Sequence, residues 1–272
     1  MILFPNAKIN LGLNVISKKD DGYHNIETVF LPVNNFCDVL EVVPKVDGSK
    51  EDSISFSGLA IPGDKDDNLC LKAVQLLREV ADIQPLNIFL HKVIPCGSGL
   101  GGGSSDAAFM LKLLNELFNI ALTHQELQEI ASEIGADCAF FILNSVTFAE
   151  GIGNLFSPLE ILPPRIWIEI VVPSFHVSTS FAYKNIVPCH PKFNLKSAIC
   201  LPIENWRDKV INDFEPQIFD NYPELKDIKE KLYSSGAIYA SMSGSGSAVF
   251  GLFKWEPAIE WDAELFVYSG YL

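Results

Sequence analysis

The chain has 272 residues, 48% hydrophobic and 20% charged, enough for one large globular domain or two ordinary ones. Its formal net charge of −14 argues against a nucleic-acid or membrane surface, because binding there depends on Lys and Arg side chains that neutralise phosphates. One small phosphorylated ligand, which needs only a local site, is compatible with this charge. No run reaches the roughly 20 apolar residues of a membrane span. The cysteines show no zinc-site spacing, and no targeting peptide is apparent, so we expect a cytoplasmic protein.

The first third of the chain predicts mostly strands. Apolar residues from Ile9 to Val15 alternate with polar ones that include Lys8, as in a strand with two different faces. Asp21-Gly22 is a turn signal before a second strand. The expected elements are strands over residues 7–17, 24–33, 36–44 and 86–93, and a helix over 68–80 with Asn68 as its N-cap.

Two helices are expected in the middle of the chain. The first covers residues 107–118. Thr123 and Glu126 have the spacing of a capping box, which begins a second helix. Gly135 is placed to end that helix.

A change of composition after residue 149 predicts a domain boundary. Residues 150–164 are rich in glycine and proline, which is typical of a link. We therefore place one domain at residues 1–155 and a second at residues 156–272. The second predicts a strand, a helix and a strand–turn–strand unit, over residues 166–172, 223–236 and 238–253. Strands and helices that occur in blocks favour an α+β fold.

A glycine-rich stretch, PCGSGLGGGSSDAA at residues 95–108, separates the fourth strand from the helix. A helix N-terminus exposes unpaired N–H groups and a partial positive charge. Glycines before it allow the backbone to approach a phosphate closely. The structural alternative is a turn with a serine cap, but so many glycines are costly in chain entropy for a turn alone. We interpret the stretch as a phosphate-binding loop.

Two common nucleotide folds do not explain this loop. It contains no G-x-x-x-x-G-K-[ST] pattern, so it is not a Walker P-loop. Residues 97–102 fit G-x-G-x-x-G, but a dinucleotide fold also needs a second strand that ends in an acid about 20 residues further on. Two helices are expected there instead, which argues against a dehydrogenase.

Two other stretches accompany the loop: PNAKINLGLNV at residues 5–15 and MSGSGSAVFGLF at residues 242–253. Together the three resemble the motifs of the GHMP small-molecule kinases. The resemblance implies a two-domain GHMP kinase fold, with an N-terminal α/β domain and a ferredoxin-like C-terminal domain. It also implies transfer of the γ-phosphate of ATP, bound with Mg²⁺, to the hydroxyl group of a small molecule.

The resemblance supplies two catalytic candidates. Asp137, in GADCAFF, is similar to the family's catalytic aspartate, and Lys8 is similar to the lysine beside it. An ammonium group there would keep the carboxylate ionised. Asp137 would either accept the proton of the substrate hydroxyl or only orient that hydroxyl, because a loose transition state needs little early deprotonation. Cys138 and Ala139 stand where the family has Val-Pro, a change expected to loosen this segment.

The resemblance assigns ATP to the glycine loop and to Asn68, near the adenine. The residues are Pro95, Gly97, Ser98, Gly99, Leu100, Gly101, Gly102, Gly103, Ser104, Ser105 and Asn68. A helix N-cap is an equally good local interpretation of Asn68, and the two roles are compatible. The ligands of Mg²⁺ stay unassigned, with Ser104 as one candidate. The SGSGS turn at residues 243–247 is expected beside the phosphates or the substrate.

The stretch DGYH at residues 21–24 narrows the resemblance to a kinase whose substrate carries a cytidyl group. Tyr23 and His24 are similar to a pair that recognises cytosine, since a planar base suits an aromatic face and in-plane hydrogen bonds. Tyr183 resembles a second aromatic on the base. Thr179 and Asn10 resemble further substrate contacts.

Other functions stay open on the sequence. The nearest alternative is a GHMP kinase for mevalonate, homoserine or a sugar. A second is a binding protein that keeps the fold without the chemistry, and a third is a nucleic-acid module, which the net charge disfavours. The oligomeric state is not predicted, and residues after 253 match no part of the family pattern. Cys96 is expected to be a packed thiol.

Overall fold

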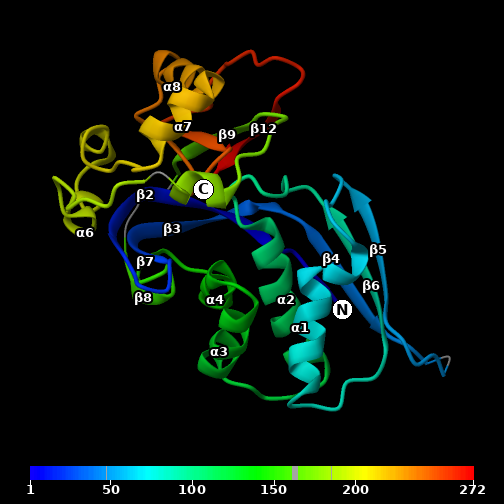
Figure 1. Cartoon of the computed structure of the whole chain (residues 1–272). Coiled ribbons are helices and arrows are strands. Elements are labelled where there is room, and N and C mark those ends of the chain that lie inside the picture. Colours follow the sequence, from blue (N-terminus) through cyan, green and yellow to red (C-terminus); the bar gives the residue numbers. More distant parts are fainter. Residues whose placement is uncertain (47, 161–164, 185) are drawn as a thin grey trace. The chain divides into compact units, whose positions relative to one another are not determined.

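The computed structural model describes residues 1–46, 48–160, 165–184 and 186–272 (Figure 1). Its contacts divide the chain into two compact units. Unit 1 comprises Met1–Ala7, Phe36–Cys96 and Gly101–Ser145, and unit 2 comprises Lys8–Asn35, Gly97–Leu100 and Val146–Leu272. Neither unit is continuous in sequence.

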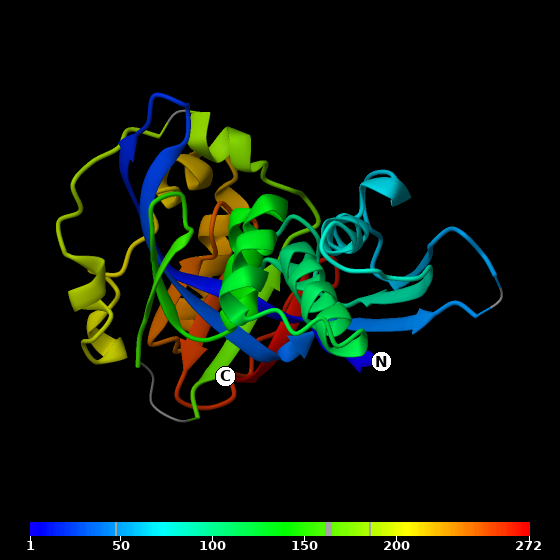
Figure 2. The same ribbon diagram turned by 90° about the horizontal axis from the view of Figure 1, so that it is seen from below.

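Unit 1 combines a sheet with a group of helices. The sheet has the order β1-β4-β6-β5, from β1 (Ile2–Leu3), β4 (Val39–Pro44), β6 (Leu86–Lys92) and β5 (Ser53–Gly58). β5 and β6 are parallel, and the other pairs are antiparallel. The helices are η1 (Lys65–Asp67), α1 (Leu69–Arg78), α2 (Gly102–Leu117), α3 (His124–Ile134) and α4 (Ala136–Leu143). The four α-helices pack against one another, as Figure 2 shows from below, and α2 also contacts β1 and β4.

The predicted helix ends in unit 1 are partly confirmed. The Asn68 side chain accepts a hydrogen bond from the N–H of Cys70 and caps α1, and the capping box of α3 is present. Gly135 ends α3, but α4 follows at once over an apolar run that was not predicted to form a helix. The helix predicted at 107–118 instead begins at Gly102, directly after Gly101, which has a left-handed conformation that glycine adopts easily.

Unit 2 contains two sheets. The first has the order β2-β3-β7-β8, from β2 (Asn6–Lys18), β3 (His24–Cys37), β7 (Thr147–Glu150) and β8 (Leu155–Pro158). The first two residues of β2 and the last two of β3 belong to unit 1. The second has the order β10-β11-β9-β12, from β9 (Trp167–Val172), β10 (Tyr239–Met242), β11 (Val249–Phe253) and β12 (Phe266–Tyr271). The helices are α5 (Thr179–Lys184), α6 (Leu195–Ala198), η2 (Ile203–Asn205), α7 (Glu215–Asn221) and α8 (Pro223–Ser234).

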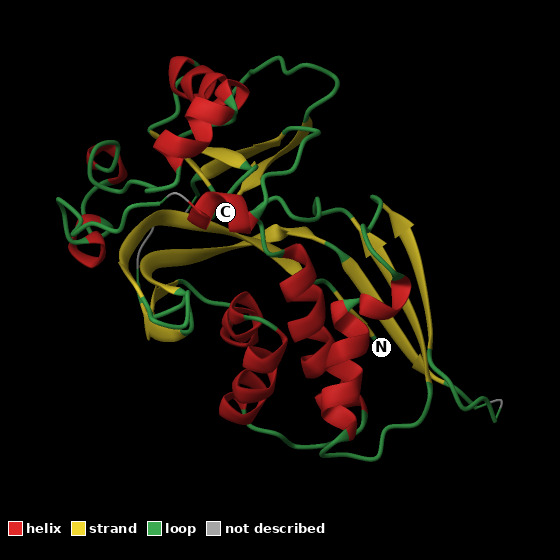
Figure 3. Ribbon diagram, in the orientation of Figure 1, coloured by secondary structure: helices red, strands yellow, loops and turns green. Residues whose placement is uncertain are grey.

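The second sheet of unit 2 has a ferredoxin-like strand order. If its four strands are numbered along the chain, they lie side by side in the order 2-3-1-4. All pairs are antiparallel, and α8 covers β10 and β11. Residues 254–265 contain no helix, so the second helix of a complete β-α-β-β-α-β unit is replaced by a loop (Figure 3). The C-terminal residues that matched no pattern supply the edge strand β12.

Two features of unit 2 were not predicted from the sequence. β2 is buried on both faces from Asn6 to Val15, so the polar side chains of its second face lie in the interior. The predicted link at 150–164 overlaps the hairpin of β7 and β8, whose pairing continues the first sheet. Residues 161–164 lie outside the described residues, and the domain boundary at 155/156 stays a prediction. No helix of the described chain is both long and apolar enough for a membrane span.

Candidate active site

Backbone hydrogen bonds join the first half of the glycine loop to two other motifs within unit 2. The N–H of Lys8, on β2, donates to the carbonyl of Leu100 at 2.9 Å. The N–H of Ala248, which follows the SGSGS turn, donates to the carbonyl of Ser98 at 2.9 Å. The three segments that the sequence singled out are therefore neighbours in this unit, although some 240 residues separate the outer two.

Ser243 is the side chain that links the same three segments. It is fully buried. Its Oγ donates to the carbonyl of Gly99 at 2.9 Å and accepts the N–H of Asn10 at 3.2 Å. Gly99 has φ +83°, and a Cβ atom there would lie 2.2 Å from the carbonyl oxygen of Ser243. Only glycine allows the loop to approach the turn this closely.

We expect Gly99→Ala to lower the free energy of unfolding by about 2–4 kcal/mol, because the added methyl group meets backbone and the φ is strained. Urea denaturation measures the change. Gly103→Ala is the matched control, since its Cβ would meet only Leu69 Cδ1, at 3.7 Å, in the first turn of α2. Equal stability of the two variants would contradict a close contact between loop and turn.

Lys8 is a buried lysine with a fixed side chain. It is 3% exposed, its Nζ donates to Asn10 Oδ1 at 2.7 Å, and it lies 5.0 Å from the centre of the Phe30 ring. Asn10 Nδ2 donates in turn to Thr28 Oγ1 at 2.9 Å. Lys8 and Asn10, the two candidate residues on β2, are thus hydrogen-bonded to each other, and the Lys8 ammonium group is oriented before any ligand binds.

Asp137 lies in the first turn of α4, in unit 1. A carboxylate at this end of a helix is favoured by the helix dipole. The neighbouring Cys138 is fully buried, and burial raises its pKa to about 11, although a hydrogen bond with Ser104 opposes this. Cys138 is therefore a packed thiol at neutral pH. Lys8 and Asp137 belong to different units, so their pairing stays a prediction.

The second half of the glycine loop borders a cavity of about 420 Å³ in unit 1. Its lining includes Asn68, Lys92, Cys96, Gly103 and Asp106. Asn68, predicted both as a cap and as a nucleotide contact, thus caps α1 and faces this cavity. Burial raises the pKa of the Cys96 thiol, which agrees with its expected inert role.

Ser105, in the first turn of α2, is fully buried. Its Oγ has no hydrogen-bond partner among the described residues. A buried hydroxyl of this kind is costly unless a ligand or water pairs with it.

A buried charge cluster that was not predicted from the sequence adjoins the same cavity. Lys92 Nζ pairs with Asp38 and, at 2.7 Å, with Asp106, and all three side chains are almost fully buried. Asp38 Oδ1 also accepts the N–H groups of Val93 and Ile94, at 2.6 and 2.9 Å. Burial raises the pKa of Asp106, helped by Asp38 and opposed by Lys92. Burial lowers the pKa of Lys92, but the two carboxylates outweigh it and raise that pKa overall.

The alternation of β6 could have revealed this lysine. Leu86, Ile88 and Leu90 are buried while the residues between them are more exposed, and Lys92 continues the buried face. A charge at such a position requires buried partners of opposite charge. The sequence did not show that those partners are Asp38 and Asp106.

The predicted base-recognition residues partly come together in unit 2. The ring of His24 stacks on Tyr183 at 5.0 Å and 28°, and Tyr183 packs edge-on against Phe214 at 4.8 Å. Burial, with a smaller effect of Lys18, lowers the pKa of His24, which favours the neutral ring with one donor and one acceptor nitrogen. Tyr23 is 63% exposed, so its ring is available to a ligand.

Thr179, at the start of α5, meets the SGSGS turn. Its Oγ1 lies 3.2 Å from Ser245 Oγ. The predicted substrate contact and the predicted turn are thus within hydrogen-bond distance of each other in this unit.

Comparisons with known proteins show the family to which this chain belongs. The family model for the GHMP kinases N terminal domain matches residues 68–145, and that for GHMP kinases C terminal matches residues 201–260. The 4-diphosphocytidyl-2-C-methyl-D-erythritol kinase of Bacteroides thetaiotaomicron is 50% identical over 275 residues, 100% of both chains. The protein of that name from Cytophaga hutchinsonii is 47% identical over 94% of each chain.

Solved structures show the same likeness. A crystal structure of 4-(cytidine 5'-diphospho)-2C-methyl-D-erythritol kinase has a TM-score of 0.78 at 33% identity, and the match covers 93% of this chain and 90% of that one. The crystal structure of homoserine kinase from Cytophaga hutchinsonii has a TM-score of 0.62 at 19% identity, and the match covers 92% of this chain and 85% of that one. At this identity the likeness shows the fold alone.

With these motifs and this fold, the chain is a GHMP kinase, a small-molecule kinase that uses ATP. Within that class it belongs to the 4-diphosphocytidyl-2-C-methyl-D-erythritol kinase family. The predicted fold and the predicted kinase class are confirmed.

Proposed function

We propose that this chain transfers the γ-phosphoryl group of ATP to the 2-hydroxyl of 4-diphosphocytidyl-2-C-methyl-D-erythritol. The products are ADP and the 2-phosphate, in the non-mevalonate pathway to isoprenoid precursors. The full-length identity of 50% to a relative of that name carries this proposal. The joined motifs around Lys8, Gly99 and Ser243 support it, because phosphoryl transfer depends mainly on positioning and on electrostatic stabilisation.

Two side chains act on the reacting groups in this proposal. Asp137 orients the substrate hydroxyl or accepts its proton, and Lys8 stabilises charge that develops at the transferred phosphoryl group. The fixed Lys8 ammonium supports its role, since it needs no reorganisation when the substrate binds.

The glycine loop and the first turn of α2 hold the phosphates of ATP, and the cavity beside Asn68 takes the base. The buried, unpaired Ser105 Oγ and the N–H groups at the start of α2 support an anion there. Among the described residues no group of three His, Cys, Asp or Glu side chains is arranged for a metal ion. Mg²⁺ would enter with ATP and neutralise phosphate charge, and its ligands in the protein stay unassigned.

The cytidyl group is recognised by Tyr23, His24 and Tyr183, with Thr179 and Asn10 near the rest of the substrate. The stack of His24 on Tyr183 and the exposed ring of Tyr23 support this assignment. The predicted cytoplasmic location, and the predicted lack of nucleic-acid and membrane partners, stay predictions.

The test is a direct assay of phosphoryl transfer. The protein is incubated with Mg²⁺-ATP and the cytidyl substrate, with mevalonate and homoserine in parallel, while ADP and product mass are followed. We expect turnover with the cytidyl substrate alone. Turnover with another alcohol would overturn the substrate assignment, and ATP binding without any turnover would indicate a binding protein.

A further inference from the structure

Asn212 lies beside the strand that carries Lys8. Its segment joins β2 through an isolated parallel bridge to Leu13. The N–H of Leu13 donates to the carbonyl of Ile211, and the N–H of Asp213 donates to the carbonyl of Leu13, both at 2.8 Å. Asn212 is 2% exposed. A polar amide is thus fixed in the interior of unit 2, where each of its hydrogen-bonding groups needs a partner.

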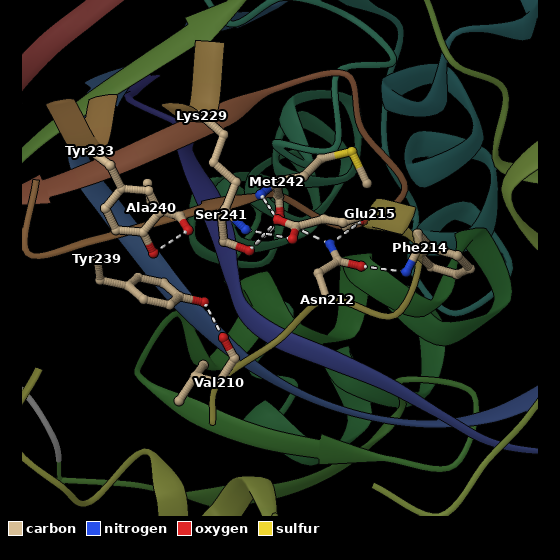
Figure 4. Close-up of polar contacts among 11 residues, drawn as sticks. Val210, Asn212, Phe214, Glu215, Lys229, Tyr233, Tyr239, Ala240, Ser241 and Met242 are labelled. Atoms are coloured by element: carbon tan, nitrogen blue, oxygen red, sulfur yellow. Dashed lines mark hydrogen bonds and ion pairs between the residues drawn. The ribbon is translucent and has the colours of Figure 1, made fainter. Parts of the chain in front are cut away.

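The Asn212 side chain holds the backbone on both sides of Ser243. Nδ2 donates to the carbonyl of Met242 at 2.9 Å, and Oδ1 accepts the N–H of Phe214 at 3.0 Å (Figure 4). Nδ2 also donates to the carbonyl of Gly244 at 2.8 Å. Both N–H donors of the Asn212 amide therefore bond carbonyl groups at the start of the SGSGS turn. No other described side chain bonds both of these carbonyls.

Glu215, three residues later, holds the other polar group of Met242. Its Oε1 accepts hydrogen bonds from the N–H of Met242 at 2.8 Å and from the hydroxyl of Ser241 at 3.0 Å. Its Oε2 pairs with Lys229 of α8 at 2.6 Å (Figure 4). The N–H and the carbonyl of Met242 are thus both held by side chains of one short segment.

The turn that is held in this way is part of the candidate active site. Ser243, between the two carbonyls, bonds Gly99 of the glycine loop and Asn10 of β2, as described above. Within the described part of the chain, the N–H groups of Gly244 and Ser245 have no acceptor. Successive free N–H groups in a turn are suited to an anionic oxygen.

We propose that Asn212 is a positioning residue for phosphoryl transfer, which sets the SGSGS turn against the glycine loop and the strand of Lys8. The proposal rests on the proposed function. Asn212 contacts no reacting atom and acts through Ser243. Small displacements of groups that position a reaction are costly, so the hydrogen bonds of one buried amide determine how well the site is aligned.

Asn212→Asp tests this with little change of shape. The carboxylate still accepts the N–H of Phe214, but both donors are lost and negative charge faces two carbonyl oxygens. We expect kcat to fall about 100-fold with little change of KM. Protonation of the new carboxyl restores one donor. The activity relative to wild type should therefore recover as the pH is lowered from about 8 to about 6.

Asn221→Asp is the matched control: the same exchange on the exposed side of α7, where Nδ2 only donates to the carbonyl of Gln217. It should leave kcat unchanged at both pH values. Hydrogen–deuterium exchange of the peptide over residues 241–249 gives a readout that needs no substrate. It should be faster in Asn212→Asp than in Asn221→Asp.

The outcomes separate this proposal from the proposed function. If wild type shows no turnover, the proposed function fails, and the exchange measurement still decides whether Asn212 orders the turn. A folded Asn212→Asp protein with wild-type kcat and wild-type exchange overturns the role of Asn212. If that variant does not fold, Ser243→Ala removes the group through which Asn212 acts. Full kcat of a folded Ser243→Ala protein overturns the proposal equally.

Discussion

Asp137→Asn is expected to lower kcat by about 10²- to 10⁴-fold if the carboxylate accepts the substrate proton. The amide keeps the size of the side chain and cannot take the proton, so the KM for ATP should change little. Steady-state kinetics with the cytidyl substrate measures both constants. A loss of less than about tenfold would indicate that Asp137 only orients the hydroxyl, because an amide oxygen can still accept that hydrogen bond.

Asp227→Asn provides the control for this experiment. Asp227 is an exposed aspartate of α8, and its exchange removes the same charge from the chain. It should leave kcat and KM unchanged. If the two variants behaved alike, Asp137 would have no part in catalysis and its match to the family pattern would be coincidental.

Lys92→Met is expected to lower the free energy of unfolding by about 3–5 kcal/mol, because it leaves Asp38 and Asp106 buried without a cation. Urea denaturation measures the change. The loss should grow as the pH rises. A buried carboxyl with a raised pKa stabilises the folded state while protonated, and that contribution is lost once it ionises. Lys92→Met combined with Asp106→Asn should recover part of the loss, since one buried charge is removed.

The control here is a lysine in an exposed ion pair. Lys254 pairs with Glu204 at 2.7 Å, and both side chains are about half exposed. Lys254→Met should cost less than about 1 kcal/mol, because solvent screens the pair. A similar small cost for Lys92→Met would mean that the buried cluster adds no more to stability than a surface pair.

Local signals predicted elements whose hydrogen bonds lie close together in sequence. The Asn68 cap and the capping box of Thr123 and Glu126 were predicted because a cap joins residues two or three positions apart. The start of α2 was placed five residues late, since Gly102 and Gly103 have a low helix propensity that neighbouring helices override. The short α4 was missed because its apolar residues give no clear period.

By itself the sequence determined the family, the kinase class and most of the strands and helices, because these depend on motifs and on local periodicity. Only the tertiary structure decided which distant residues meet. Lys92 pairs with Asp38 and Asp106, and Asn212 donates hydrogen bonds to the backbone on both sides of Ser243. These residues lie too far apart in the sequence for a local pattern to predict the contacts. Such pairings follow from strand order and from the burial of polar groups, which must find partners wherever the fold brings them. Nothing local in the sequence distinguishes Asn212, and only the fold shows that its amide bonds the carbonyls of Met242 and Gly244.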